Sequence, residues 1–386
     1  MINTAQNPNQ IISLSEDRRD KIRGSLIAGA AGDALGYEVE FVYGKGILQK
    51  YGEGGITEYA LHNGLARISD GTQMTLYTAN GLLYGATQAK LNGIEAPMER
   101  YIHYAYLDWL ETQDGKKNKK PVCWLNNVGD LYSRRAPGNS CLSALRSGRM
   151  GTVEEPINHS KGCGGVMRVA PIGLFFKNDG ETDRIREIMA LGGKAAAITH
   201  GHPLGYIPAA GLVHIISRIV YGGCKYGHLP HQILRECREL LAEIYGDDIY
   251  TGRMKELIDQ AAALANKGGS DMDNIHAIGG GWVGEEALAI AIYCWLRYPS
   301  DFDKALIASV NHGGDSDSTG AILGNILGAA VGYEAIGKKW KRNLEFHDLI
   351  LDLADDLCDE SRLGHTSQVW QDKYVRHCYA PVRIHG

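Results

Sequence analysis

The chain has 386 residues, of which 44% are hydrophobic and 22% are charged, and its formal net charge at pH 7 is −5. This composition is ordinary for a soluble globular protein, and the slightly acidic balance gives no support for a nucleic-acid partner or a membrane partner. No apolar run approaches the ~20 residues that span a bilayer, and from the polar start MINTAQNPNQ we do not expect a secretory leader.

The first predicted feature is an N-terminal boundary. The first twelve residues are mostly polar, and Ser13 and Glu16 have the spacing of a capping box at a helix start. We therefore predict a flexible arm over residues 1–12 and a domain over residues 13–386. No Pro- or Ser-rich linker divides the chain after the arm, so the sequence favours one compact domain.

Helical periodicity of apolar residues runs through this domain, and alternating β-branched runs are nearly absent, so we predict an all-α fold. The predicted helices cover residues 72–90, 97–111, 183–199, 206–220, 231–245, 254–266, 284–296, 302–310, 319–332 and 346–358. Many of the 49 glycines lie in Ala- and Leu-rich segments such as GSLIAGAAGDALG and GAILGNILGAAVG. We interpret most of these glycines as positions where two helices pack closely.

The segment GDALG, residues 32–36, ends an apolar stretch and leads to Glu38 and Glu40. Burying Asp33 there is unfavourable unless its carboxylate is hydrogen-bonded or serves a site. Two interpretations remain open. Asp33 caps a neighbouring helix, or it belongs to a functional site.

The segment ISDGTQMTL, residues 68–76, places an acidic residue between hydroxyls ahead of an apolar run. Ser69, Asp70 or Thr72 is a suitable N-cap for the helix that follows. The other interpretation is a metal site that lacks one carboxylate, because Gly71 directly follows Asp70.

The segment NHGGDSDSTG, residues 311–320, offers the carboxylates of Asp315 and Asp317 and the hydroxyl of Ser318 within four residues. These oxygen donors suit a hard divalent cation such as Mg²⁺, Mn²⁺ or Ca²⁺. Both acidic segments precede expected helices, whose N-terminal dipoles repel cations. Metal binding is therefore favoured if the two clusters meet in space.

Two further segments are candidates for ligand binding. In NHSKGCGGVMR, residues 158–168, the glycines permit close backbone approach to a ribose or a phosphate. No feature around Cys163 marks a nucleophilic thiol. The segment THGHP, residues 199–203, lacks a third soft ligand for zinc, so we expect a histidine there to orient a substrate.

Taken together and in chain order, these motifs resemble the ADP-ribosylglycohydrolase family, typified by dinitrogenase-reductase-activating glycohydrolase and the ADP-ribosylarginine hydrolases. The matching segments span nearly the whole chain after the predicted arm: residues 25–42, 68–76, 134–145, 160–174, 198–203, 279–293 and 311–329. The resemblance implies an all-α domain of orthogonally packed helices. It also implies two divalent metal ions, Mg²⁺ or Mn²⁺, at the base of an ADP-ribose cleft.

The resemblance implies roles for individual residues. The metal ligands would be Ser69, Asp70, Asp315, Asp317 and Ser318, and the catalytic residues Glu40, Asp70 and Asp317. The substrate-binding residues would be Gly162, Cys163, Gly164, Gly165, Val166, His200, Gly313 and Gly314. Arg134 and Arg135 lie in a matching segment, but the sequence assigns them no role.

The implied activity is hydrolysis of the bond between ADP-ribose and a side chain of a modified protein. We expect the N-glycosidic bond to arginine, and a serine O-glycoside remains an alternative. Two metal ions ~3.5–4 Å apart can anchor ribose hydroxyls and polarise a water. Glu40 is the candidate general acid or base, next to an oxocarbenium-like transition state.

The family pattern in the second segment is Ser/Thr-Asp-Asp-Thr, whereas this chain reads Ser69-Asp70-Gly71-Thr72. Loss of one anionic ligand should weaken the metal site, so we expect an impaired enzyme, either by nature or by a disabling substitution. The alternative is a non-catalytic protein on the same fold that binds ADP-ribose or blocks an ADP-ribosyltransferase toxin, in the manner of a bacterial immunity protein. The scattered cysteines without a Cys-x-x-Cys pair are typical of reduced thiols, so we expect a cytoplasmic location.

Overall fold

The computed structural model describes residues 8–93, 96–116, 120–178, 180–222, 230–358 and 367–381. Within these ranges the structure is helical, and β-type pairing is limited to isolated bridges such as that between Gly162 and Val283. The predicted all-α class and single compact domain are confirmed. The α-helices are α1 (Pro8–Tyr37), α2 (Gly44–Tyr51), α3 (Asp70–Asn92), α4 (Met98–Asp114), α5 (Asn139–Arg146), α6 (Ala170–Phe175), α7 (Thr182–Ala197), α8 (Pro203–Tyr221), α9 (Pro230–Tyr245), α10 (Ile249–Lys267), α11 (Asp271–Ile278), α12 (Gly284–Arg297), α13 (Phe302–Val310), α14 (Ser316–Val331), α15 (Lys338–Lys341), α16 (His347–Cys358) and α17 (Gln368–Tyr374).

The N-terminal boundary differs from the one expected. Helix α1 begins at Pro8, so residues 8–12 are helical and Ser13 lies inside the helix rather than at its cap. Proline suits a first helical position, because its missing N–H has no partner there in any case. Residues 1–7 of the predicted arm lie outside the described residues.

The ten helices predicted by periodicity are all present, and their ends agree within five residues. The periodicity of apolar residues did not predict six helices, namely α2, α5, α6, α11, α15 and α17. Each of them has eight residues or fewer, which is too short for an apolar face to repeat convincingly.

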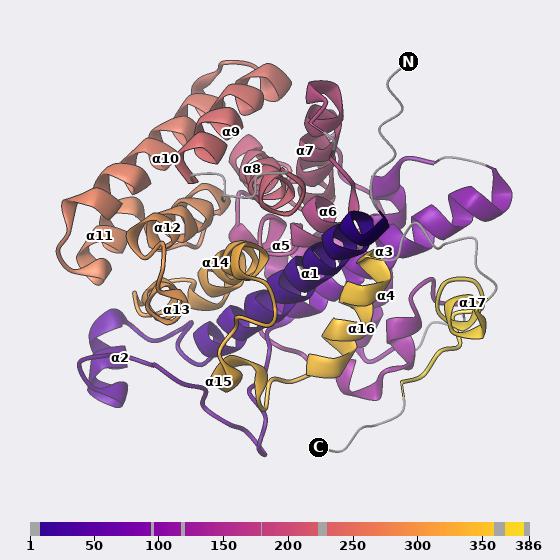
Figure 1. Cartoon of the computed structure of the whole chain (residues 1–386), viewed down its shortest axis with the longest axis horizontal. Helices are drawn as coiled ribbons and strands as arrows, with labels where there is room; N and C mark the ends of the chain where they lie inside the picture. The colour runs from indigo at the N-terminus through magenta and orange to yellow at the C-terminus, as the bar shows by residue number, and fades with distance from the viewer. Residues whose placement is uncertain are drawn as a thin grey trace.

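Helices α1 and α14 run side by side through the middle of the molecule (Figure 1). A Cβ atom on Gly32 would collide with the backbone oxygen of Gly320, and one on Gly324 would collide with that of Ala28. These contacts confirm that the glycines of both segments serve close helix packing, since any side chain would push the backbones apart.

The same contacts set the direction of the pair. Gly24 lies against Gly328 in the middle of α1, whereas Gly36 lies against Ser316 near its end. The two helices are therefore antiparallel, and the last turns of α1 lie beside the first turn of α14. This arrangement brings Asp33 and the acidic start of α14 to the same place.

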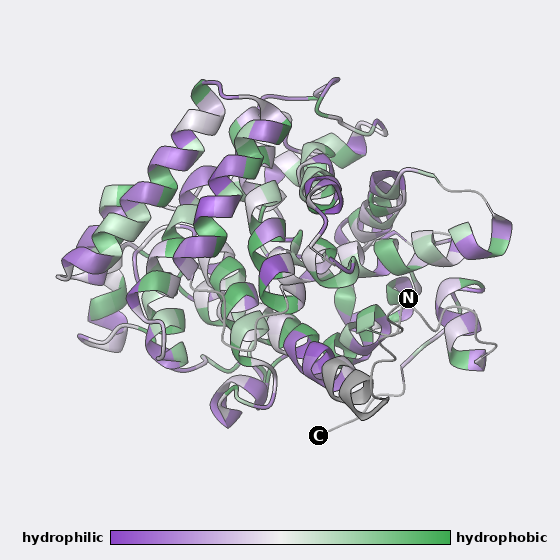
Figure 2. Cartoon of the chain, turned by 45° about the horizontal axis from the view of Figure 1, so that its top comes forward, coloured by the Kyte–Doolittle hydropathy of each residue, from purple (hydrophilic) through white to green (hydrophobic). Residues whose placement is uncertain are grey.

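The outer helices surround this pair. Figure 2 shows hydrophilic residues mainly along the outer helices and hydrophobic residues where helices meet in the middle. Among the described residues, α8 alone is long and apolar enough by composition to cross a membrane, and 83% of its apolar window is buried inside the protein. Its position in the core accounts for that composition.

Candidate functional site

Asp33 joins the end of α1 to the start of α3. Its carboxylate accepts hydrogen bonds from the backbone N–H of Ser69 at 3.0 Å and from that of Thr72 at 3.1 Å. The hydroxyls of both residues donate to it as well. The capping interpretation of Asp33 is therefore confirmed. Asp33 also lies beside Asp317, and its part in a functional site stays a prediction.

The first turn of α3 holds the other residues of the second motif. Ser69 is the N-cap, and its hydroxyl accepts a hydrogen bond from the backbone N–H of Gly71 at 3.1 Å. One carboxylate oxygen of Asp70 accepts from the N–H of Gly138 at 3.1 Å, and the N–H of Asp70 donates to the carbonyl of Arg135 at 2.8 Å. Asp70 is thus held by the segment that contains the unassigned arginines.

Arg135 has a structural role, which is to hold Glu345. Its guanidinium forms an ion pair with Glu345 at 2.9 Å, and the other oxygen of Glu345 accepts the backbone N–H of Ile68 at 3.0 Å. Glu345, just ahead of α16, therefore joins the segment ahead of α5 to the segment ahead of α3. No local pattern predicts this pair, because the partners are 210 residues apart.

The start of α14 brings the third motif to the same place. Asp315 is the N-cap and accepts the N–H of Ser318 at 3.3 Å, while a carboxylate oxygen of Asp317 accepts the same N–H at 2.8 Å. The N–H of Asp315 donates to the carbonyl of Gly280 at 2.8 Å. The thiol of Cys163 donates to the Asp315 carboxylate at 2.7 Å.

Glu38 and Glu40 separate after the end of α1. Glu38 turns outward and accepts from Lys50 at 2.9 Å and lies 3.0 Å from His62. Glu40 is 7% exposed, and its Oε2 atom is buried without a hydrogen-bond partner. Of the two, Glu40 therefore belongs to the site.

The cluster contains five buried carboxylates, those of Asp33, Glu40, Asp70, Asp315 and Asp317. Burial and the charge of Asp317 raise the pKa of Asp33 to about 7. Burial is the largest cause of the raised pKa values of the other four as well, and neighbouring carboxylates add to it. Across the described ranges no Lys or Arg forms an ion pair with any of the five, although the charge of Arg168 partly offsets the raised pKa of Asp70.

These observations fit a bound divalent cation. Closely spaced buried carboxylates and the unpartnered Glu40 oxygen both offer oxygen ligands to a positive ion. Among the described residues, no group of three or more His, Cys, Asp or Glu side chains is arranged to hold a metal ion. The residues predicted to hold metal, Ser69, Asp70, Asp315, Asp317 and Ser318, are all buried at this cluster, and their role as ligands stays a prediction.

Gly71 lies in the first turn of α3, next to this cluster. A Cβ atom there would lie 3.3 Å from the sulfur of Met167 and from the Ser69 hydroxyl, and 3.7 Å from an oxygen of Asp33. The sulfur belongs to a flexible side chain that can shift. Position 71 therefore has room for a Cβ atom beside the cluster with small movements of Met167 and Ser69.

The glycine loop over residues 162–166 lies against the start of α12. The N–H of Cys163 donates to the carbonyl of Trp282 at 3.2 Å, and Val166 is fully buried with its N–H bonded to the Cys163 carbonyl at 2.7 Å. His200 is 2% exposed and lies behind the loop, where a Cβ on Gly162 would be 3.3 Å from its Nε2 atom. Direct substrate contact by these loop residues and by His200 stays a prediction.

Gly313 and Gly314 serve close backbone packing in this structure. A Cβ on Gly313, whose φ is +76°, would collide with the backbone of Gly44, and one on Gly314 would collide with the carbonyl of Gly280. Their predicted contact with substrate also stays a prediction. Three further residues lie in or beside the site although the family resemblance assigns them no role: Asp33, Arg135 and Met167.

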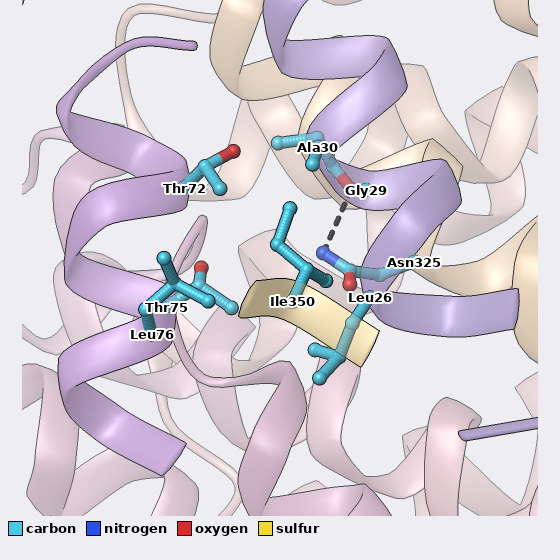
Figure 3. Close-up of a pocket in the computed structure, with 9 residues that line it drawn as sticks. Leu26, Gly29, Ala30, Thr72, Thr75, Leu76, Asn325 and Ile350 are labelled. Atoms are coloured by element: carbon cyan, nitrogen blue, oxygen red, sulfur yellow. Dashed lines mark hydrogen bonds between the residues drawn. The ribbon is translucent and has the colours of Figure 1, made fainter. Parts of the chain in front are cut away.

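A small cavity of about 10 Å³ lies under the start of α3. Figure 3 shows Thr72 and Thr75 on one side of it and Asn325 on the other, with Ile350 between them. The Oδ1 atom of Asn325 is buried without a partner. The volume suits about one water molecule, so this cavity is far too small for a nucleotide.

Known proteins share this arrangement of segments. A family model described as ADP-ribosylglycohydrolase matches residues 14–366. Human ADP-ribosylhydrolase ARH3 is 27% identical over 221 residues, which cover 51% of this chain and 58% of that protein. The match therefore spans little more than half of the length of ARH3.

Other relatives match over most of their length. The ADP-ribosyl-[dinitrogen reductase] glycohydrolase of Rhodospirillum rubrum is 24% identical over 84% of this chain and 90% of that protein. ADP-ribosylhydrolase ARH1 of Dictyostelium discoideum is 24% identical over 88% of this chain and 94% of that protein. A solved structure titled ADP-ribosylglycohydrolase-related protein complex superposes with a TM-score of 0.61 at 22% identity, over 90% of this chain and 99% of that one, which supports the fold. Because the family model covers most of the sequence, the chain belongs to the ADP-ribosylglycohydrolase family.

Proposed function

We propose that this chain is a hydrolase that removes ADP-ribose from modified protein side chains, with arginine as the linked residue. The observation that carries the proposal is the meeting of five buried carboxylates with the glycine loop at one place in the fold. Family membership supports the same activity, because relatives carry the name ADP-ribosylhydrolase.

Each residue of the cluster has a separate role in this proposal. Two divalent ions, Mg²⁺ or Mn²⁺, would supply charge to hold ribose hydroxyls and to polarise a water. Ser69, Asp70, Asp315, Asp317 and Ser318 are the residues assigned to hold them. Glu40 has an oxygen without a partner, so we assign it to move a proton at the glycosidic bond.

The glycine at position 71 should reduce this activity. In this proposal an aspartate at position 71 would add a sixth carboxylate next to the Ser69 hydroxyl and Asp33, where a Cβ has room. Without it, the metal site has one anionic ligand fewer, and metal affinity falls. The same feature favours the second candidate function, a non-catalytic protein that binds ADP-ribose on this fold.

The test measures release of ADP-ribose from an arginine-ADP-ribosylated protein with Mn²⁺ or Mg²⁺. The chain is compared with Gly71→Asp, and Gly71→Asn is the matched control of similar size without charge. We expect turnover to rise with Gly71→Asp and not with Gly71→Asn, together with tighter metal binding by calorimetry.

Three other outcomes are informative. Equal turnover and metal affinity in the chain and in Gly71→Asp would show that Gly71 impairs nothing. Turnover of a serine-linked substrate alone would replace the arginine assignment. ADP-ribose binding without turnover of either linkage, in all variants, would favour the non-catalytic protein.

A further inference from the structure

Arg168 is a fully buried arginine directly after the glycine loop and Met167. Its guanidinium lies 4.3 Å from the ring centroid of Tyr106, and among the described residues it forms no ion pair. A buried guanidinium without a carboxylate is unfavourable unless its N–H groups are used elsewhere. Its two terminal nitrogens donate hydrogen bonds, whereas its Nε–H is buried without a partner among the described residues.

The two terminal nitrogens of Arg168 reach different acceptors. Nη2 donates to the hydroxyl of Thr199 at 2.7 Å and to the carbonyl of Ala195 at 3.2 Å. Nη1 lies 3.4 Å from the sulfur of Cys141, as a donor to it. Arginine has no acceptor, so the direction of each of these bonds is certain.

The Thr199 hydroxyl lies 2.8 Å from Nδ1 of His200. It already accepts from Arg168, and its single proton has two possible acceptors, Nδ1 of His200 and the thiol of Cys141. Sulfur is the weaker acceptor, and it already receives an N–H from Arg168. Nδ1 of His200 is therefore the preferred acceptor of the Thr199 proton, and in that arrangement Nδ1 carries no hydrogen.

A neutral imidazole that accepts at Nδ1 carries its proton on Nε2. Burial and the nearby charge of Arg168 lower the pKa of His200 to about 3, so the neutral form is present at physiological pH. Cβ atoms added to Gly162 and Gly164 would lie 3.3 Å and 3.4 Å from Nε2. No partner of Nε2 is present among the described residues, so this N–H is presented at the glycine loop.

We propose that Arg168 is a positioning residue, which acts through Thr199 to hold His200 in the Nε2–H form and so to present a hydrogen-bond donor to an oxygen-bearing ligand on the glycine loop. The ligand class is a sugar hydroxyl or a phosphate oxygen, which are acceptors that suit a neutral donor. The part that concerns the ligand rests on the proposed function, and the tautomer does not.

The test uses the full chain with ¹⁵N-labelled histidine, and His200→Asn assigns the ring signals. In the unmodified chain and in Thr199→Ser, which keeps the hydroxyl, we expect Nδ1 to be unprotonated and Nε2 protonated. In Thr199→Val, which keeps the shape and loses the hydroxyl, the tautomer should no longer be held. Arg168→Lys should weaken the preference, because one ammonium cannot serve both Thr199 and Cys141.

Binding of free ADP-ribose by calorimetry gives the second measurement. Thr199→Val should bind about three- to tenfold more weakly than Thr199→Ser, as expected for one misplaced donor. Near-ultraviolet circular dichroism confirms that both variants keep their packing. An Nδ1–H signal in the unmodified chain, or equal affinity and tautomer in the two variants, would overturn the inference. If no variant binds ADP-ribose but the tautomer behaves as expected, the proposed function fails and the role of Arg168 in holding the tautomer stands.

Discussion

The thiol of Cys163 donates a hydrogen bond to a carboxylate oxygen of Asp315 at 2.7 Å. The contact joins the glycine loop to the first turn of α14 across 152 residues of sequence. Burial, reinforced by the charge of Asp315, raises the pKa of the Cys163 thiol well above its usual value. The thiol therefore acts as a hydrogen-bond donor at neutral pH and not as a nucleophile.

Replacing this thiol tests the contact. Cys163→Ala leaves an oxygen of Asp315 without its donor, and we expect the free energy of unfolding to fall by about 1–3 kcal/mol. Cys163→Ser keeps a donor and should lose less. Urea unfolding of the metal-free proteins measures both, and equal losses in the two variants would show that the hydrogen bond contributes nothing.

Glu40 should destabilise the metal-free protein at neutral and alkaline pH. Its folded pKa is raised, mainly by burial and by the charge of Asp317, above the value of 4.5 expected in the unfolded chain. Between these two pKa values the folded state binds more protons than the unfolded state, so stability falls as the pH rises. At pH 4 and below both states hold the proton, and this contribution disappears.

Glu40→Gln removes that titration and keeps the shape of the side chain. In EDTA we expect the variant to be more stable than the parent at pH 8, by about 1–3 kcal/mol, and nearly equal to it at pH 4. Urea unfolding at both pH values measures the difference. The same variant should lose turnover, and a stability difference independent of pH would contradict the assignment.

The packing of α1 on α14 should be intolerant of side chains. A Cβ on Gly324 collides with the backbone of Ala28, so Gly324→Ala has to separate the two helices that carry Asp33 and Asp317. We expect a loss of about 1–3 kcal/mol or more in unfolding free energy, together with weaker metal binding. Thermal unfolding and Mn²⁺ calorimetry measure the two effects.

Gly252 offers the matched control for this change. It lies in α10, and a Cβ there would meet nothing within 4 Å. Gly252→Ala should therefore raise the unfolding free energy by about 0.5–1 kcal/mol through helix propensity alone. A similar loss in both variants would mean that close packing is not the reason for Gly324.

The ion pair between Arg135 and Glu345 should control the position of Asp70. Its side chains are only 15% and 10% exposed, and the Arg135 carbonyl holds the N–H of Asp70. Glu345→Ala leaves a nearly buried guanidinium without its partner, and we expect a loss of about 3 kcal/mol, at the lower end for buried pairs. Glu345→Gln keeps one acceptor oxygen and the shape of the side chain, and it should lose less. Chemical denaturation checks the order, and unchanged Mn²⁺ affinity in both variants would contradict the link to Asp70.

Much of the helical structure could be predicted from the sequence because it depends on patterns of neighbouring residues. The period of apolar residues is enough to locate α3 or α12 within a few residues, since one face of each must be buried. The start of α1 was placed wrongly, because the Ser13–Glu16 spacing fits a cap equally well inside and at the end of a helix. Short helices such as α2 and α5 carry too few turns to show a period.

The sequence by itself determined which chemical groups the site contains, because Asp70, Asp315, Asp317 and the loop glycines are recognisable as oxygen donors and points of backbone approach. Only the tertiary structure decided how these groups meet. The antiparallel packing of α1 on α14 brings Asp33 beside Asp317, and the Cys163 thiol reaches Asp315 from a distant segment. Contacts between residues far apart in the chain depend on which helices pack together. A periodic pattern shows which face of a helix is buried, but it does not show which other helix covers that face.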